Sequence, residues 1–217
     1  MINKIEEQLI SYKNSGKKLF TTSSFQTHST VLLHIISRID KTIPVYCLNT
    51  GYLFGETLEY RNTISSAFGL NVITINPEVP KSLQKDYEGR LLFVADPDRC
   101  CHYNKVMPME PLLVDHDVWI NGVRADQSSV RKAMKTEQKA KHGCLRYHPM
   151  LEWTNKMIFD YIKEFDLPKH PLDARGYTSI GCEPCTRRPT LEMMERESRW
   201  YGQNKVECGL HTELIEK

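Results

Sequence analysis

Apolar and polar residues alternate with two periods over the first 75 residues. Apolar side chains recur at helical spacing in three segments, and short apolar runs bounded by turn residues lie between them. The predicted helices cover residues 2–14, 29–39 (capped by Ser29) and 55–67. The predicted strands cover residues 18–22, 44–48 and 72–75. This order of strands and helices predicts an α/β fold with a parallel sheet and right-handed crossovers.

The remainder of the chain is less regular. We predict a strand at 118–122, an edge strand at 147–151, a helix at 154–165 capped by Thr154, and a helix at 189–200. Residues 77–101 receive no firm assignment, and the polar, Lys-rich residues 126–143 are expected to form an exposed loop. We expect residues 1–200 to form a single α/β domain and residues 201–217 a mobile tail with little core of its own.

The bulk composition narrows the class of protein. The chain has 217 residues, of which 40% are apolar, so it has enough apolar residues for one globular domain. A net charge of +2 is too small for a basic nucleic-acid surface. No apolar run has the length of a membrane span, and the N-terminus lacks the apolar core of a signal peptide. We therefore expect a cytoplasmic protein that binds neither nucleic acid nor membrane.

The seven cysteines are distributed unevenly. Four of them form two close pairs, Cys100-Cys101 and Cys182-Glu183-Pro184-Cys185. In a cytosolic protein such pairs indicate metal binding or catalysis rather than disulfides. Four thiolates brought together would suit either zinc or an iron–sulfur cluster, and a purely structural zinc site remains an alternative. Cys47 and Cys144 have no predicted role.

Three other features carry candidate chemistry. The loop at 22–29 follows a strand and opens a helix, so its N–H and hydroxyl groups favour an anion, although it is not a Walker loop. Cys208 lies in the polar tail with His211 three residues on, where it is either an exposed nucleophile or a surface cysteine without a role. The third feature is a set of guanidinium groups suited to phosphate and sulfate, or to surface ion pairs: Arg124, Arg187, Arg188, Arg196 and Arg199.

Taken together, these motifs resemble the assimilatory adenylyl-sulfate and phosphoadenylyl-sulfate reductases, a branch of the adenine-nucleotide alpha-hydrolase-like, PP-loop-type fold. The resemblance runs from about Phe20 to His211. It rests on the following segments: Thr22-Ser23-Ser24-Phe25, residues 49–57, Cys100-Cys101 with Lys105, residues 122–128, residues 180–186, residues 195–200 and Glu207-Cys208-Gly209-Leu210-His211.

The resemblance implies a role for individual residues. Cys100, Cys101, Cys182 and Cys185 would ligate a [4Fe–4S] cluster, and Cys208 would be the catalytic nucleophile carried over the site by the tail. The substrate-binding residues would be Ser23, Ser24, Thr50, Gly51, Lys105, Arg124, Arg196, Arg199 and His211. The implied reaction reduces adenylyl sulfate to sulfite and AMP through an S-sulfocysteine, with thioredoxin or glutaredoxin as reductant, in sulfate assimilation and cysteine biosynthesis.

Substrate choice is implied by the cysteines. Family members with both pairs usually carry the cluster and use adenylyl sulfate, members without them use phosphoadenylyl sulfate, and some cluster-bearing members accept both. This chain departs from its relatives at Gln26-Thr27-His28 and at Arg187-Arg188, near residues that could read the ribose 3′ position. ATP pyrophosphatases and the small subunit of sulfate adenylyltransferase need a Ser-Gly-Gly-x-Asp-Ser type loop, which the chain lacks. A non-catalytic, zinc-stapled nucleotide-binding protein is the alternative of another class. The oligomeric state, a homo-oligomer included, is left open.

Overall fold

A computed structural model describes residues 1–193, 196–203, 205 and 207–215 of the chain. The strands are β1 (Leu19–Thr22), β2 (Val45–Leu48), β3 (Val72–Ile75), β4 (Val118–Ile120), β5 (Glu137–Lys139) and β6 (Leu145–Tyr147). The α-helices are α1 (Ile2–Asn14), α2 (Thr27–Ile39), α3 (Gly55–Phe68), α4 (Leu92–Ala95), α5 (Pro97–Cys101), α6 (Met107–Asp115), α7 (Ser129–Lys132) and α8 (Asn155–Glu164). A π-helical turn, His102–Val106, joins α5 to α6.

The strands form one six-stranded sheet in the order β3-β2-β1-β4-β6-β5. All neighbouring strands run parallel except β5 and β6, which are antiparallel. From β1 the chain moves outward through β2 and β3, and it then returns to place β4 on the other side of β1. The loops after β1 and β4 therefore leave the sheet in opposite directions, which opens a crevice at their carboxyl ends.

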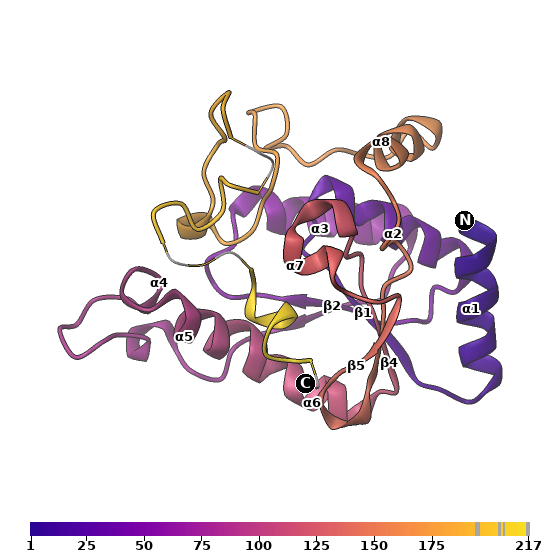
Figure 1. The fold of residues 1–217 in the computed structure, drawn as a ribbon, viewed down its shortest axis with the longest axis horizontal. Coiled ribbons are helices and arrows are strands. Elements are labelled where there is room, and N and C mark those ends of the chain that lie inside the picture. Colours follow the sequence, from indigo (N-terminus) through magenta and orange to yellow (C-terminus); the bar gives the residue numbers. More distant parts are fainter. Residues whose placement is uncertain (194–195, 204, 206, 216–217) are drawn as a thin grey trace.

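Helices cover both faces of the sheet (Figure 1). On one face, α1, α2, α3 and α8 bury the larger apolar core, in which Leu33 and Ile36 of α2 are almost fully inaccessible to solvent. On the other face, α6 packs against Phe20 and Trp119, which are paired in register on β1 and β4. Leu214, near the C-terminus, joins this second core. Among the described residues, no helix has both the length and the apolar content needed to cross a membrane.

The alternation predicted for the first 75 residues is confirmed, and so is the helix capped by Thr154, whose side chain accepts the Met157 N–H at 3.3 Å. The cap predicted at Ser29 is wrong. Helix α2 starts at Thr27, and Ser29 lies inside it, donating its hydroxyl to the Gln26 carbonyl at 2.7 Å.

Two predictions for the segment around β5 and β6 are wrong. The strand expected at the edge, at 147–151, lies at Leu145–Tyr147 inside the sheet, and the edge is β5. Residues 126–143, expected to be an exposed loop, include α7 and β5, and they bury Arg131 and Ala140. The sequence Glu137-Gln138-Lys139 is polar throughout, so it lacks the alternation that identifies a half-buried strand.

The helix predicted at 189–200 is not present among the described residues of that range. Isolated turns form within the range, and two backbone hydrogen bonds connect its last residues to the segment of the second cysteine pair. The Arg187 N–H donates to Ser198 O at 3.2 Å, and the Trp200 N–H donates to Cys185 O at 3.1 Å. Thr186 and Arg199 form an isolated antiparallel bridge. Arg196 and Arg199 therefore do not share a helix face, and Glu195 lies outside the described residues.

Candidate active site

The crevice between β1 and β4 is lined by the two loops that follow these strands. Ser23 and Ser24 come from the first loop and Arg124 from the second. The first loop turns at Phe25, whose φ of 51° is unusual for a residue with a side chain. The fully buried Phe25 ring and the bond from its N–H to Ser23 Oγ, 3.0 Å long, hold this turn. The loop backbone is thus fixed at the start of α2.

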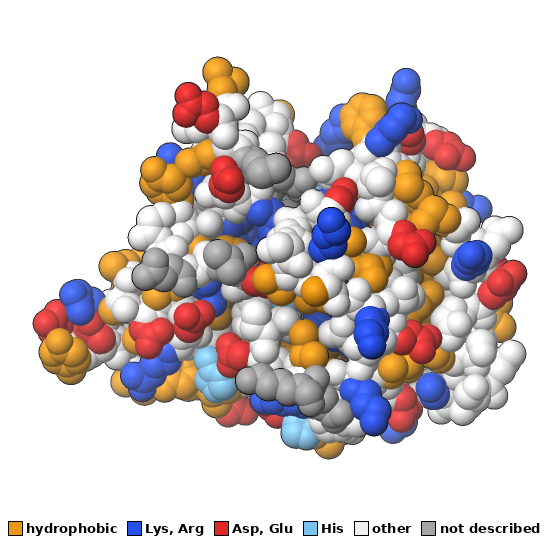
Figure 2. All heavy atoms as spheres, viewed as in Figure 1, with side chains coloured by type: hydrophobic (Ala, Val, Ile, Leu, Met, Phe, Trp, Pro, Cys, Tyr) orange, Lys and Arg blue, Asp and Glu red, His pale blue; other side chains and the backbone are white. Residues whose placement is uncertain are grey.

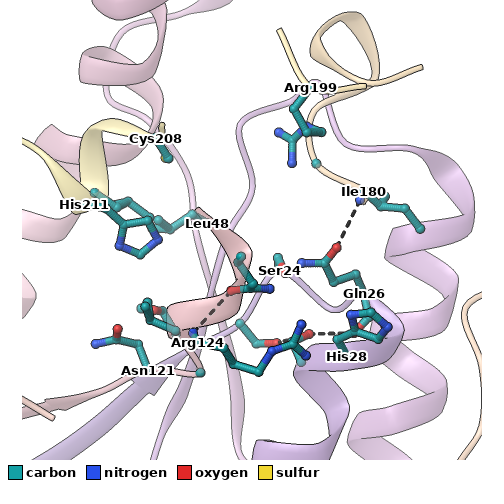
Figure 3. Close-up of a pocket in the computed structure, with 18 of the residues that line it drawn as sticks. Ser24, Gln26, His28, Leu48, Asn121, Arg124, Ile180, Arg199, Cys208 and His211 are labelled. Atoms are coloured by element: carbon teal, nitrogen blue, oxygen red, sulfur yellow. Dashed lines mark hydrogen bonds between the residues drawn. The ribbon is translucent and has the colours of Figure 1, made fainter. Parts of the chain in front are cut away.

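The cavity over these loops is strongly basic. Its described lining contains five cationic side chains and no Asp or Glu: Lys105, Arg124, Arg131, Arg196 and Arg199. Figure 2 shows basic side chains recessed at the centre of this face of the molecule. Figure 3 shows Arg124, Arg199, Cys208 and His211 around one open space, with Ser24, Gln26 and His28 at its base. An excess of guanidinium groups in a concave site favours a ligand with phosphate or sulfate groups.

Two of these arginines are held in place by neighbouring groups. Arg124 is 1% exposed, and its guanidinium donates to Asp126 at 3.1 Å and also to Asn155 at the start of α8. Arg199 is 8% exposed and donates to Cys185 O at 3.2 Å. It lies against Gly181, where a Cβ atom would come within 2.1 Å of Arg199 Nη2, so a side chain at this position would displace the guanidinium. Both cations are therefore positioned before any ligand binds.

The C-terminal residues close the cavity on its remaining side. Cys208 precedes a helical turn, Gly209–His211, and both Cys208 and His211 line the cavity. Arg146, stacked 4.4 Å from the Trp119 ring, donates to Leu210 O at 3.1 Å and to His211 Nδ1. Burial, together with the charges of Arg131 and Arg146, holds the pKa of His211 well below its usual value, so His211 is neutral and accepts this bond.

Cys208 faces the cationic end of Lys105. The pKa of Cys208 lies well below its usual value, because the Cys101 thiol donates a hydrogen bond to it and the Lys105 charge and the Leu210 N–H add to this effect, outweighing burial. Burial acts to lower the pKa of Lys105, but electrostatic interactions with the sulfur atoms of Cys182, Cys208 and Cys101 raise it above its usual value. Cys208 therefore has the low pKa of a nucleophilic thiol. It is 9% exposed, although the sequence led us to expect an exposed cysteine.

The two cysteine pairs lie together in a second cavity beside the first. Cys100, Cys101, Cys182 and Cys185 all line it, all are buried, and none forms a disulfide. Cys182 lines both cavities. The Asn104 side chain lies 3.5 Å from Cys100 Sγ, and Thr50 Oγ1 lies 3.2 Å from Cys182 Sγ. Cys208 and the two cysteine pairs, which come from both halves of the chain, are thus brought to the same place.

The donor set fits a four-iron cluster. In the described part of the chain, no three Cys, His, Asp or Glu side chains converge on one point, as a single metal ion would require. A [4Fe–4S] cluster does not require such convergence, because each of its four thiolates binds a different iron atom. Four buried thiols lie around one cavity, so each could bind one iron atom. Lys105 lies beside them, and its positive charge would offset the negative charge of the sulfur ligands.

Most of the predicted site residues are brought together by the structure. Those that line the basic cavity are Ser23, Ser24, Lys105, Arg124, Arg196, Arg199, Cys208 and His211. Thr50 instead lines the cysteine cavity, and Gly51, with a φ of 70°, is not among the lining residues of either. Sequence reasoning missed Asn121 and Arg131 on the cavity wall, and also Arg146 and Glu207 behind it. Arg131 had a detectable signal, because it is a basic residue soon after Arg124 in the segment that follows β4.

Fold and site together define an α/β protein with the PP-loop-type fold, in which a thiol lies beside a basic cavity. Consistent with this class, a solved FMN adenylyltransferase from Candida glabrata superposes with a TM-score of 0.61 at 14% identity, over 95% of this chain and 74% of that one. The solved phosphoadenylyl-sulfate reductase from Candida auris superposes with a TM-score of 0.68 at 21% identity, covering 82% of this chain and 87% of that one.

Sequence comparison identifies the family. The model of the phosphoadenosine phosphosulfate reductase domain matches residues 18–188. An adenosine 5′-phosphosulfate reductase of Chelativorans sp. (strain BNC1) is 38% identical over 197 residues, which is 90% of this chain and 80% of that protein. The chain therefore belongs to the phosphoadenosine phosphosulfate reductase family, a family of enzymes.

Proposed function

We propose that this protein is an adenylyl-sulfate reductase of sulfate assimilation, acting in the cytoplasm. The observation that carries the proposal is the Cys208 thiol, held opposite Lys105 at the wall of a cavity lined by four arginines and no described carboxylate. The substrate, a nucleotide with adjoining phosphate and sulfate groups, matches this charge. The Chelativorans relative, which is named for adenosine 5′-phosphosulfate, supports this substrate over the 3′-phosphorylated form.

In the first step, the Cys208 thiolate attacks the sulfur of adenylyl sulfate. A bond forms between Cys208 Sγ and that sulfur, and the bond from sulfur to the bridging phosphate oxygen breaks. AMP leaves with the electron pair, and the enzyme retains an S-sulfocysteine. Lys105 and the arginines stabilise the charge on the sulfate and on the departing phosphate. The Lys105 charge and the Leu210 N–H favour the thiolate whatever the state of Cys101.

In the second step, a dithiol reductant of the thioredoxin or glutaredoxin type attacks Cys208 Sγ. Sulfite leaves with the electron pair of the S–S bond, and a mixed disulfide forms between the enzyme and the reductant. The second thiol of the reductant then releases Cys208, so the two electrons come from the dithiol. Because Cys208 is buried, the reductant could reach it only if the residues around it moved aside, as the predicted mobile tail would allow.

Cys100, Cys101, Cys182 and Cys185 would hold a [4Fe–4S] cluster beside the sulfate end of the substrate. When bound, it would contribute its charge and hold the two cysteine segments together. Asn104 and Thr50, in contact with Cys100 and Cys182, would orient the sulfur ligands. Lys105 would balance the negative charge of the thiolates.

The intact mass of anaerobically purified protein, measured after incubation with each nucleotide and without reductant, tests the proposal. We expect one added sulfonate, located on Cys208, from adenylyl sulfate. An addition from both nucleotides would mean dual specificity, and an addition only from phosphoadenylyl sulfate would make that compound the substrate. If protein that holds its cluster gains no mass from either nucleotide, the proposed reaction is wrong.

A further inference from the structure

Next to the nucleophile, Glu207 is the most completely bonded carboxylate in the described structure. The residue is 3% exposed, and it lies between two arginines of the cavity wall. Arg131 donates to both of its oxygens, from Nε at 2.9 Å and from Nη2 at 3.0 Å. Arg196 Nη2 donates to Oε1 at 2.9 Å. Ser128 Oγ lies 3.3 Å from Oε2.

A fourth residue, Cys208 itself, also donates to this carboxylate. The backbone N–H of Cys208 donates to Glu207 Oε1 at 3.0 Å, and this is the oxygen that Arg196 also contacts. The Glu207 carboxylate therefore fixes the backbone at Cys208 as well as the two guanidinium groups. Burial acts to raise the pKa of Glu207, but the bonds and charges of Arg131 and Arg196 outweigh burial and keep it below its usual value. Glu207 is thus a buried carboxylate with its charge retained.

The two arginines belong to different parts of the chain. Arg131 lies on α7, whose first turn is capped by Ser128 accepting the Arg131 N–H at 3.2 Å. Arg196 follows the second cysteine pair and lies 5.7 Å from the Trp200 ring. Glu207 therefore joins α7, the segment after the cysteines and the tail through one carboxylate. The nearest comparable acid on the tail, Glu213, makes only a half-exposed ion pair with His102 at 2.8 Å.

We propose that Glu207 is a positioning residue, which holds the tail closed over the site by bridging Arg131 and Arg196 and thereby sets Cys208 opposite Lys105. The proposal rests on the proposed function for its catalytic consequence, but the bridge itself is independent of it. Glu207 also neutralises one of the two positive charges that Arg131 and Arg196 add to the cavity. The Glu207 carboxylate therefore favours closure of the tail but lowers the affinity of the cavity for anions.

This coupling predicts an unusual pair of effects for Glu207→Gln. The amide is nearly the same size but has no charge to hold two guanidinium groups, so the tail opens and kcat falls about tenfold or more, as expected when one partner of a buried ion pair is removed. The same change leaves Arg131 and Arg196 without a counter-ion in the cavity wall. AMP, used as the binding probe, should then bind a few-fold more tightly. A purely structural defect would weaken binding and turnover together.

The experiment compares cluster-loaded wild type, Glu207→Gln and the control Glu213→Gln, which removes the charge of an acid on the same tail. It measures kcat, the Kd for AMP, and amide hydrogen exchange over residues 207–215. We expect faster exchange, lower kcat and tighter AMP binding in Glu207→Gln only. Exchange and turnover like those of Glu213→Gln, or parallel losses of AMP binding and turnover, would overturn the proposal.

Two further arms keep the test decisive. If Glu207→Gln does not fold, Glu207→Asp replaces it, because aspartate keeps the charge but is shorter by one methylene. We expect faster amide exchange at 207–215 in this variant and an unchanged affinity for AMP. Unchanged exchange would contradict the proposed bridge. If wild type turns over neither nucleotide, the proposed function fails, whereas the exchange and AMP measurements still decide whether Glu207 holds the tail.

Discussion

The first 75 residues and the last 40 reach the same cavity by different means. The first part is a regular alternation of strands and helices, in which the loop at 22–29 is positioned by a buried sheet and by α2. The last part, from about residue 177, has no α-helix or strand among its described residues, and it is positioned by isolated hydrogen bonds, ion pairs and a few buried side chains such as Leu214. A packed sheet offers the ligand a fixed surface, while a segment held by a few contacts can open. We infer that the first part supplies a fixed binding loop, whereas the second part supplies the reacting thiol together with arginines that can move with it.

Replacing the nucleophile should separate the two parts most sharply. In Cys208→Ser we expect sulfite formation to fall by a factor of about 10³ or more, because a hydroxyl at neutral pH is far less nucleophilic than a thiolate. Binding of AMP and the brown colour of the cluster should persist, since neither depends on the Cys208 sulfur. The matched control is Cys144→Ser, a buried cysteine outside both cavities. Loss of colour in Cys208→Ser but not in the control would make Cys208 a cluster ligand.

Two core substitutions compare how much each part contributes to the free energy of unfolding. Leu33→Ala removes a buried side chain between α2 and the sheet, so we expect the free energy of unfolding to fall by about 2–5 kcal/mol. Leu214→Ala removes an equally buried side chain of the tail, but the tail can detach without unfolding the sheet. We expect a smaller loss of global stability and faster amide exchange near residue 214. Urea unfolding and hydrogen exchange measure these effects, and equal losses in both variants would mean that the tail unfolds together with the sheet.

The smallest expected effect concerns pH and a buried histidine that lies outside both parts. His148 is fully buried near Arg131 and Arg146, and burial first, then these charges, lower its pKa to about 4. Because the folded pKa lies below the ordinary value of 6.5, the unfolded chain binds the proton more readily. The contribution of His148 is therefore complete above pH 6.5 and is lost as the pH falls toward 4, with a slope of at most about 1.4 kcal/mol per pH unit. Urea unfolding across this range should show a flatter pH dependence in His148→Gln, and an identical dependence would contradict the assignment.

The same contrast explains what the sequence could predict. Helices α2 and α3 and strands β1 to β3 were predicted because burial on one face leaves a periodic apolar pattern. Strand β5 carries only polar residues at the edge of the sheet, so no period marks it. Residues 196–200 have the charged composition of a helix, yet their backbone pairs with the cysteine loop. That pairing depends on contacts between distant residues, which no local pattern encodes.

Prediction of the site divides in a similar way. The paired cysteines were found because their residue types and spacing are chemically unusual, whereas the roles of Cys208 and Lys105 were implied by the resemblance to the reductase family. Arg131 and Glu207 were missed because a basic and an acidic residue 76 positions apart, each ordinary alone, become a buried bridge only in the folded chain. Thr50 was expected at the nucleotide, but its hydroxyl lies at Cys182. The roles inferred for the predicted residues stay predictions until variants are measured.

The π-helical turn at His102–Val106 has a consequence for how this site can vary. In an α-helix each residue advances about 100° around the axis, so one residue inserted or deleted rotates everything beyond it by that angle. The wide turn lies between Cys101 and α6 and contains Lys105, so it sets the angle at which the cysteine pair and this lysine meet the cavity. Deleting one residue from the turn would restore an ordinary helix and direct the cysteines away from their partners. The number of residues in this turn is therefore under stricter geometric constraint than the identity of partly exposed side chains such as Tyr103.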